Sequence, residues 1–130
     1  MAKVTMQLDG MEALKRAVTE APKELRRHMS AAIRASTNAV ADEMRRFASE
    51  HAQSGALLQS IEAKVPASAT GLSASVEINR EAYHWIFLEY GTVRMSARPF
   101  IRPAAERETP RFLARVDNVG TLLERFWEQK

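Results

Sequence analysis

The sequence predicts an α+β fold, in which a small antiparallel β-sheet packs against one long α-helix, with short helices and a C-terminal helix around them. Three observations support it: strand-like alternation around residues 61–78, a long helical pattern over 22–51, and a second helical pattern near the C-terminus. A chain of 130 residues is one domain on length alone. We therefore expect a single domain over residues 1–130.

The chain is expected to begin with a strand and a short helix. Apolar and polar side chains alternate over residues 3–8, which is typical of a half-buried strand. The dipeptide Asp9-Gly10 then marks a turn, and helical spacing of apolar residues predicts a short helix over 11–20.

A long helix is predicted from Pro22, which suits the first helical position, to about His51. A helix of about 30 residues spans ~45 Å, which is longer than a compact domain of this size needs. We therefore expect it to cross the sheet and to extend toward a neighbour. Small residues in its middle permit close approach, and its apolar stripe consists of Leu25, Met29, Ile33, Ser36, Val40, Met44 and Phe47.

A β-hairpin is predicted after the long helix. One helical turn is expected at residues 56–59, and strict alternation follows over 61–65 and again over 72–78. The connection is too short for a crossover, so the two strands are expected to be antiparallel. The sheet would combine this hairpin with the N-terminal strand, and the segment around Phe100 is a further candidate strand.

The stretch from residue 83 to residue 106 organises the rest of the chain. It opens with the densest apolar and aromatic run of the sequence, which we expect to form the core, with a short helix over 81–88. Two prolines prevent a continuous helix further on. The prediction is a buried element that ends at Glu89 or Tyr90, a projecting loop from Gly91 to Arg98, and a return at Pro99–Pro103, where Phe100 and Ile101 anchor the loop.

A C-terminal helix is expected to begin at Ala104 and to kink or restart at Thr109-Pro110, because this pair is typical of a cap followed by a first-turn proline. Apolar residues then recur every three or four positions, which predicts an amphipathic helix over about 110–128. The apolar side of such a helix must pack against another part of the protein or against another subunit. Packing on its own domain and packing on an adjacent subunit both remain open.

Composition limits the class of protein. The chain has no cysteine, so packing or oligomerisation must hold the fold. No apolar run approaches the ~20 residues that cross a bilayer, and the N-terminus lacks the apolar core of a signal peptide, so we expect the protein to stay in the cytoplasm. A net charge of +3 is consistent with nearby nucleic acid, but simple solubility is the more common reason for such a charge.

The basic charge is concentrated in one window. Arginine suits bidentate pairing with carboxylates or phosphates, also between subunits, so this window is the candidate functional region. It contains two acids, Glu106 and Glu108, and six arginines, which are Arg94, Arg98, Arg102, Arg107, Arg111 and Arg115.

No pattern in the sequence indicates catalysis, a cofactor or a metal. His28, His51 and His84 lie far apart without metal-ligand spacing, and the glycines are scattered at predicted turns rather than gathered in a phosphate-binding loop. We therefore expect a protein that is not an enzyme.

Glu89 is the one carboxylate flanked by large apolar residues. Because a buried acid needs a partner, we expect it to pair with an arginine of the following loop, holding the base of that loop, or with the next subunit, rather than to be an ordinary carboxylate in water at the end of a helix. The candidate contacts with other subunits or with partner proteins are Glu89, Tyr90, Thr92, Arg94, Met95, Arg98 and Arg102.

Several of these segments resemble one family. The order Leu-Glu-Tyr-Gly-Thr at 88–92, a short loop, and Ala-Arg-Pro-Phe-Ile-Arg-Pro-Ala at 97–104 closely resembles the tail-completion, or head-tail joining, proteins of long-tailed double-stranded DNA bacteriophages and prophages. Gly-Met-Glu-Ala-Leu at 10–14 and Ser-Gly-Ala-Leu-Leu-Gln-Ser-Ile at 54–61 fit the same family in the same order.

The resemblance implies a structural virion protein of the phage neck, assembled in the host cytoplasm. It implies a homo-oligomeric ring, typically a hexamer, that joins the tail tube or tail terminator to the head-closure and connector proteins. DNA would pass through this ring without sequence-specific contacts, and no membrane would be involved. If the protein does belong to a phage tail, the alternative is that it is the tail terminator protein. A small basic nucleic-acid-binding protein is an alternative of another class, although no recognisable reading motif supports it.

Overall fold

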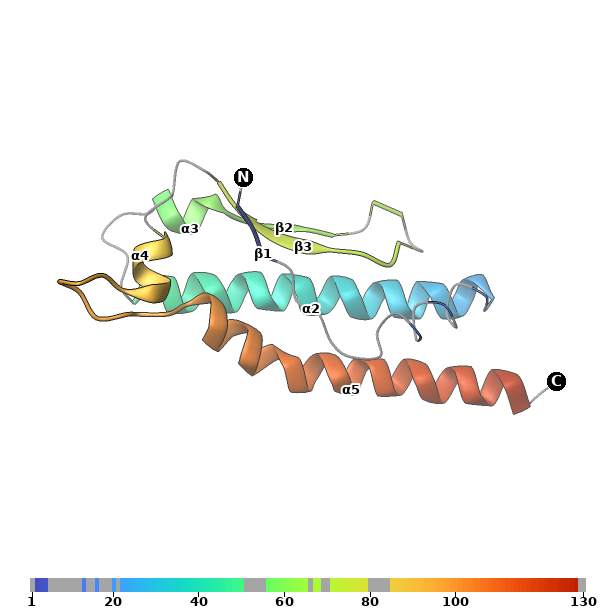
Figure 1. Cartoon of the computed structure of the whole chain (residues 1–130). Coiled ribbons are helices and arrows are strands. Elements are labelled where there is room, and N and C mark those ends of the chain that lie inside the picture. The colour runs from blue at the N-terminus through green and yellow to red at the C-terminus, as the bar shows by residue number, and fades with distance from the viewer. Residues whose placement is uncertain are drawn as a thin grey trace.

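In the computed structural model, described for residues 2–4, 13, 16, 20, 22–50, 56–65, 67–68, 71–79 and 85–128, a long central helix separates a sheet from a second long helix. The sheet lies on one side of α2 and α5 lies on the other (Figure 1). The predicted α+β class is therefore confirmed. The elements are β1 (Ala2–Val4), α2 (Lys23–Ser49), α3 (Ala56–Ser60), β2 (Ile61–Lys64), β3 (Ser75–Ile78), α4 (Trp85–Tyr90) and α5 (Ile101–Glu128).

The three strands form one antiparallel sheet in the order β1-β3-β2. The predicted hairpin is confirmed, with Ile61 opposite Ile78, although its second strand begins at Ser75. β1 confirms the start of the N-terminal strand, while the remainder of that prediction and almost all of the helix predicted for 11–20 lie outside the described residues. The candidate strand at Phe100 is wrong, because this residue forms a bend directly before α5.

The long helix α2 confirms the predicted apolar stripe. All of the stripe is buried except Phe47, which is half-buried. Pro22 is the N-cap residue rather than the first helical residue, because its ψ of 155° is extended. Near the other end, the Arg45 Nη2 atom donates a hydrogen bond of 2.7 Å to the Ile61 carbonyl oxygen, which ties α2 to β2.

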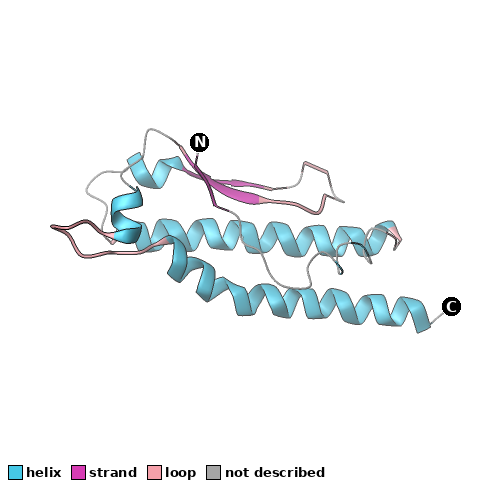
Figure 2. Ribbon diagram, in the orientation of Figure 1, coloured by secondary structure: helices cyan, strands magenta, loops and turns pink. Residues whose placement is uncertain are grey.

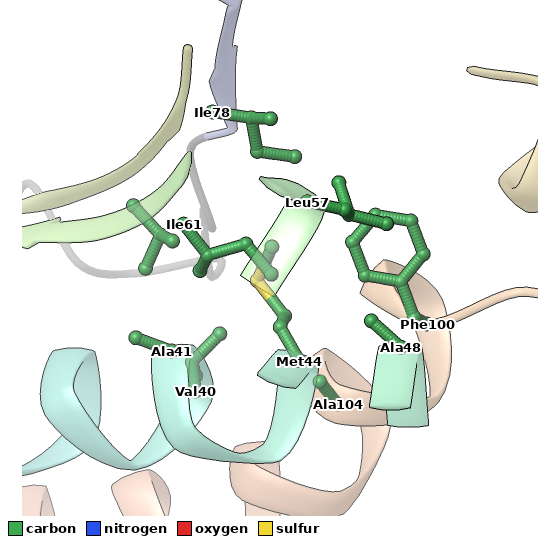
Figure 3. Close-up of a cluster of buried hydrophobic side chains, with 10 residues drawn as sticks. Val40, Ala41, Met44, Ala48, Leu57, Ile61, Ile78, Phe100 and Ala104 are labelled. Atoms are coloured by element: carbon green, nitrogen blue, oxygen red, sulfur yellow. The ribbon is translucent and has the colours of Figure 1, made fainter. Parts of the chain in front are cut away.

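Two clusters of buried side chains hold the layers together. The main core lies between the sheet, α2 and the start of α5 (Figure 3), and it consists of Val40, Ala41, Met44, Ala48, Leu57, Ile61, Val76, Ile78, Phe100 and Ala104. The helix–helix core joins the N-terminal half of α2 to α5, and it consists of Met29, Ala32, Ile33, Phe112 and Val119. The N-terminal half of α2 is thus covered by α5 of the same chain.

α5 is continuous, so the predicted start at Ala104 and the predicted restart at Thr109-Pro110 are wrong. The Thr109 hydroxyl does not cap a new helix but donates to the Ala105 carbonyl oxygen at 2.7 Å. Pro110 removes one intrahelical hydrogen bond, and Figure 1 shows that α5 curves over its first turns. The helix persists through the proline because Ala104 and Phe112 are both buried against α2.

Candidate functional site

The short helix α4 presents two different faces. Trp85 and Leu88 are half-buried against the main core, whereas Ile86, Phe87 and Tyr90 are exposed, Tyr90 at 75%. The expectation that this apolar run forms the core is therefore wrong for about half of its side chains. The reason is geometric: a six-residue helix at the end of the domain turns only one of its faces to the core.

After α4 the chain forms the projecting loop that was predicted for Gly91–Arg98. Thr92 and Met95 exchange two backbone hydrogen bonds, of 2.8 and 3.3 Å, around a turn with Val93 and Arg94 at its tip. The Arg98 amide donates a hydrogen bond of 2.7 Å to the Leu88 carbonyl oxygen, which ties the end of the loop to α4. The loop extends beyond the helices at one end of the molecule (Figure 2).

Gly91 lets the chain leave α4 in this direction. Its φ is +75°, and an added Cβ would lie 2.8 Å from the Ala97 amide nitrogen and 2.9 Å from the Met95 carbonyl oxygen. We predict that Gly91→Ala destabilises the protein by about 1–3 kcal/mol, because both the backbone conformation and its backbone neighbours must shift.

The matched control is Gly120→Ala, because nothing lies within 4 Å of an added Cβ in the middle of α5. This variant should gain roughly 0.5–1 kcal/mol, since alanine is the better helix former. Urea unfolding of both variants measures the difference. Equal stability of the two variants would contradict the role of Gly91.

The Glu89 carboxylate clamps the two ends of the loop together. It accepts hydrogen bonds from the backbone amides of Phe100 and Ile101 at 2.9 Å and of Arg102 at 3.0 Å. In a helix that begins at Ile101, the amides of residues 100–103 have no intrahelical acceptor, and Pro103 has no N–H. Glu89 therefore satisfies every amide left unpaired at this helix start, and its negative charge suits the helix N-terminus.

Glu89 thus lies at the base of the loop, but its partners differ from the predicted arginine. The carboxylate binds backbone amides rather than an arginine side chain. The sequence contained one missed signal: a helix that starts without serine, threonine, aspartate or asparagine at its N-cap needs an acceptor from elsewhere.

We predict that Glu89→Ala destabilises the protein by about 2 kcal/mol, because several charge-assisted hydrogen bonds are lost together. Amide hydrogen exchange at Phe100, Ile101 and Arg102 should accelerate in the same variant. Glu106→Ala is the control, since this exposed glutamate forms a long surface ion pair with Arg102, at 3.8 Å, and should change stability by less than about 0.5 kcal/mol. Unchanged exchange at the three amides would disprove the clamp.

Phe100, the residue predicted to anchor the loop, is part of the main core. Its side chain is fully buried and lies beside Leu57 and Ala48 (Figure 3), and the adjacent Ile101 packs against the main core. Pro99 precedes the buried ring in the loop's return, and Pro103 lies in the first turn of α5. The loop is therefore fixed at its base, and its tip is exposed to solvent.

Most of the arginine-rich window is paired within the chain. Arg107 Nε lies 3.7 Å from Glu43 of α2, and Arg102 Nε lies 3.8 Å from Glu106. A hydrogen bond from Arg46, with Arg107 and Arg111 nearby, lowers the pKa of the Glu43 carboxyl below its ordinary value of 4.5.

The fully buried Glu108 forms ion pairs with two further arginines of the window. It pairs with Arg115, which also donates to the Ser36 hydroxyl of α2 at 2.7 Å, and it lies 3.5 Å from Arg111. Arg94 and Arg98, in contrast, are exposed on the loop, and neither forms an ion pair with another described residue. The candidate region therefore narrows from the whole window to the loop.

We use the term loop surface for six exposed side chains of α4 and the loop. Of the predicted contact residues, Tyr90, Thr92, Arg94, Arg98 and Arg102 are exposed, Met95 is half-buried, and Glu89 is the clamp. The predicted contacts did not include three exposed apolar residues, Ile86, Phe87 and Val93. Only Val93 had a usable signal in the sequence, because it is a β-branched residue at the tip of a predicted loop. The loop surface consists of Ile86, Phe87, Tyr90, Val93, Arg94 and Arg98.

Neither a metal-binding cluster nor a membrane-spanning helix occurs among the described residues. These residues include no group of three or more histidine, aspartate or glutamate side chains that could hold a metal ion. Among the described helices, none combines the length and the apolar character needed to span a membrane.

Comparison with known proteins identifies the family. A sequence model of the family described as "Bacteriophage HK97-gp10, putative tail-component" matches residues 12–91. The match includes α2, the hairpin and α4, and it ends at Gly91, so the rest of the loop and α5 lie outside it. No curated protein and no solved structure gives a significant match. Because the matched residues make up more than half of the chain, this protein belongs to the HK97-gp10-like family of bacteriophages and is a structural component of the phage tail and of the virion.

Proposed function

We propose that this protein is the tail-completion component of the phage neck. Copies of the chain form a ring, with six subunits expected, around the path of the DNA. The ring joins the tail tube or tail terminator on one side to the head-closure and connector proteins on the other, and it assembles in the host cytoplasm. Its role is structural rather than catalytic.

The observation that carries this proposal is the loop surface. Ile86, Tyr90 and Val93 expose apolar side chains next to Arg94 and Arg98. Aromatic residues and arginine are enriched in protein–protein interfaces, and adjacent exposed apolar side chains mark such sites. The clamp at Glu89 and the buried anchor at Phe100 hold this surface in one conformation, so binding orders little of the chain.

The charge distribution favours protein partners over nucleic acid. Four of the six arginines between residues 94 and 115 are occupied by Glu43, Glu106 or Glu108. Two exposed arginines on one loop form a small footprint for a duplex, whose binding depends on many phosphate contacts. DNA therefore passes through the proposed ring without sequence-specific contacts.

Phage assembly without this protein tests the proposal. Induction of a prophage that lacks the gene should yield filled heads and tails of normal length that remain separate in electron micrographs. Purified protein added to this lysate should join them and restore infectivity. A variant with Tyr90→Ala and Val93→Asp should fold but fail to restore joining, whereas the control Arg27→Ala, exposed on α2, should restore it.

Other assembly defects would overturn the proposal. Tails of abnormal length would indicate a tail terminator, and heads without any tails would indicate a role in building the tube. Duplex binding by the purified chain, with affinity that falls steeply with salt, would instead support a nucleic-acid-binding role.

A further inference from the structure

The outer face of α5 is a second surface that the neck role does not yet use. Its members are spaced by seven and four residues, so they lie on one side of the helix. The opposite side of α5 carries Phe112 and Val119 into the helix–helix core. The outer face consists of Glu106, Leu113, Asp117, Glu124 and Glu128, all of which are exposed.

This outer face and the loop surface are complementary. On the outer face, the exposed apolar side chain of Leu113 lies between Glu106 and Asp117, and Glu124 and Glu128 follow further toward the C-terminus. The loop surface places two arginines around the fully exposed side chain of Val93. The loop has no carboxylate of its own, and the adjacent Glu89 is turned toward the amides of α5. Opposite charges around apolar centres steer two surfaces together and set their register.

The two surfaces cannot meet within one chain. The loop extends away from α5 at the end of the molecule where α5 begins (Figure 1). Leu113 lies twelve residues into that helix, ~18 Å along its axis at 1.5 Å per residue. The Glu89 clamp and the buried Phe100 also prevent the loop from folding back over the helix. The complement of each surface is therefore on another molecule.

We propose that the loop surface of one subunit docks on the outer face of α5 of the next copy of this chain. Val93 lies against Leu113, and Arg94 and Arg98 approach Asp117 and Glu124. This contact rests on the proposed ring and supplies its subunit interface. Because it joins two different surfaces, it is heterologous, and repetition with a closing rotation produces a ring.

Disulfide cross-linking tests the contact directly, since the chain contains no native cysteine. A Val93→Cys protein mixed with a Leu113→Cys protein should form a cross-linked heterodimer under mild oxidation. The control partner is Asn118→Cys, which is also exposed on α5 but outside the outer face. We expect the Val93–Leu113 pair to cross-link at least about tenfold faster than the Val93–Asn118 pair, because repeated contact raises effective concentration. Equal rates would overturn the proposal.

Charge reversal on the same cysteine background provides a second test. Arg94→Glu with Arg98→Glu should slow the cross-link about tenfold, and so should Asp117→Arg with Glu124→Arg. The chain that carries all four changes should regain most of the rate, because the charges again match. Lys23→Glu with Arg27→Glu, at the start of α2, is the control of equal charge change and should have little effect. Failure of the fourfold variant to recover would contradict the proposed pairing.

The outcomes separate this contact from the neck role. A ring without the Val93–Leu113 cross-link, in a lysate where the protein joins heads to tails, would overturn the contact and leave the neck function standing. The cross-link in a protein that does not join heads to tails would retain the contact and overturn the neck function. Protection of the cysteine at position 93 by duplex DNA, but not by a second copy, would assign the loop to nucleic acid and overturn the contact.

Discussion

Replacing Phe100 by alanine should destabilise the protein by about 3–5 kcal/mol, since the fully buried ring leaves a cavity in the main core. This is a large share of the ~5–15 kcal/mol that stabilises a typical domain. The substitution should also loosen the loop. The buried Phe100 ring holds the segment between Arg98 and α5 in place, and the backbone amide of this residue donates a hydrogen bond to the Glu89 carboxylate. Urea unfolding measures the loss of stability.

Tyr90→Ala is the matched control for Phe100→Ala. It also removes an aromatic ring from the same region, but from a side chain that is 75% exposed. It should change the free energy of unfolding by less than about 1 kcal/mol. If the two variants lost similar stability, Phe100 would not be the anchor that its burial indicates.

Replacing Arg115 by methionine should cost about 3–5 kcal/mol, because it leaves Glu108 buried without its closest cation. Arg111 lies 3.5 Å from the other carboxylate oxygen, but its side chain is half exposed, and water screens its charge. The Ser36 hydroxyl of α2 would also lose a donor. The measurement is again urea unfolding. The dependence of the free energy of unfolding on urea concentration should be the same in both proteins, which shows that the unfolded state has not changed.

A double variant separates the effect of an isolated charge from the effect of a lost contact. Arg115→Met combined with Glu108→Met should recover most of the stability, because apolar side chains of similar volume replace a buried ion pair at little cost. If the double variant is as unstable as the single one, the ion pair itself holds α5 on α2. If Arg115→Met is as stable as the natural protein, Glu108 does not depend on this arginine.

The pattern of side chains was sufficient to predict most elements of the fold. Helical spacing identified α2 nearly to its ends, and period-two alternation identified the hairpin. These signals are strong because one face of each element is buried, so local sequence records the direction of the core. The loop between α4 and α5 was predictable for another local reason, since Gly91 and Pro99 interrupt helical structure in any context.

Local patterns were misleading where tertiary packing outweighed them. Thr109-Pro110 has the features of a helix start, but α5 continues through it because the residues on both sides pack on α2. The apolar run of α4 has no periodicity, so nothing in it separated Trp85, which contacts the main core, from Tyr90, which is exposed. An alternating or amphipathic run would have indicated the buried side.

The sequence by itself therefore determined the order of the elements, the antiparallel hairpin, the break before α5 and the phage tail family. The tertiary structure alone decided the partners of the two informative carboxylates and the exposed side of α4. In the sequence Glu89 lies between two apolar residues and Glu108 follows an arginine, yet Glu89 caps the helix that begins at Ile101 and Glu108 is buried against α2. Burial and hydrogen-bond partners depend on which distant segments pack together, and spacing along the chain does not record that.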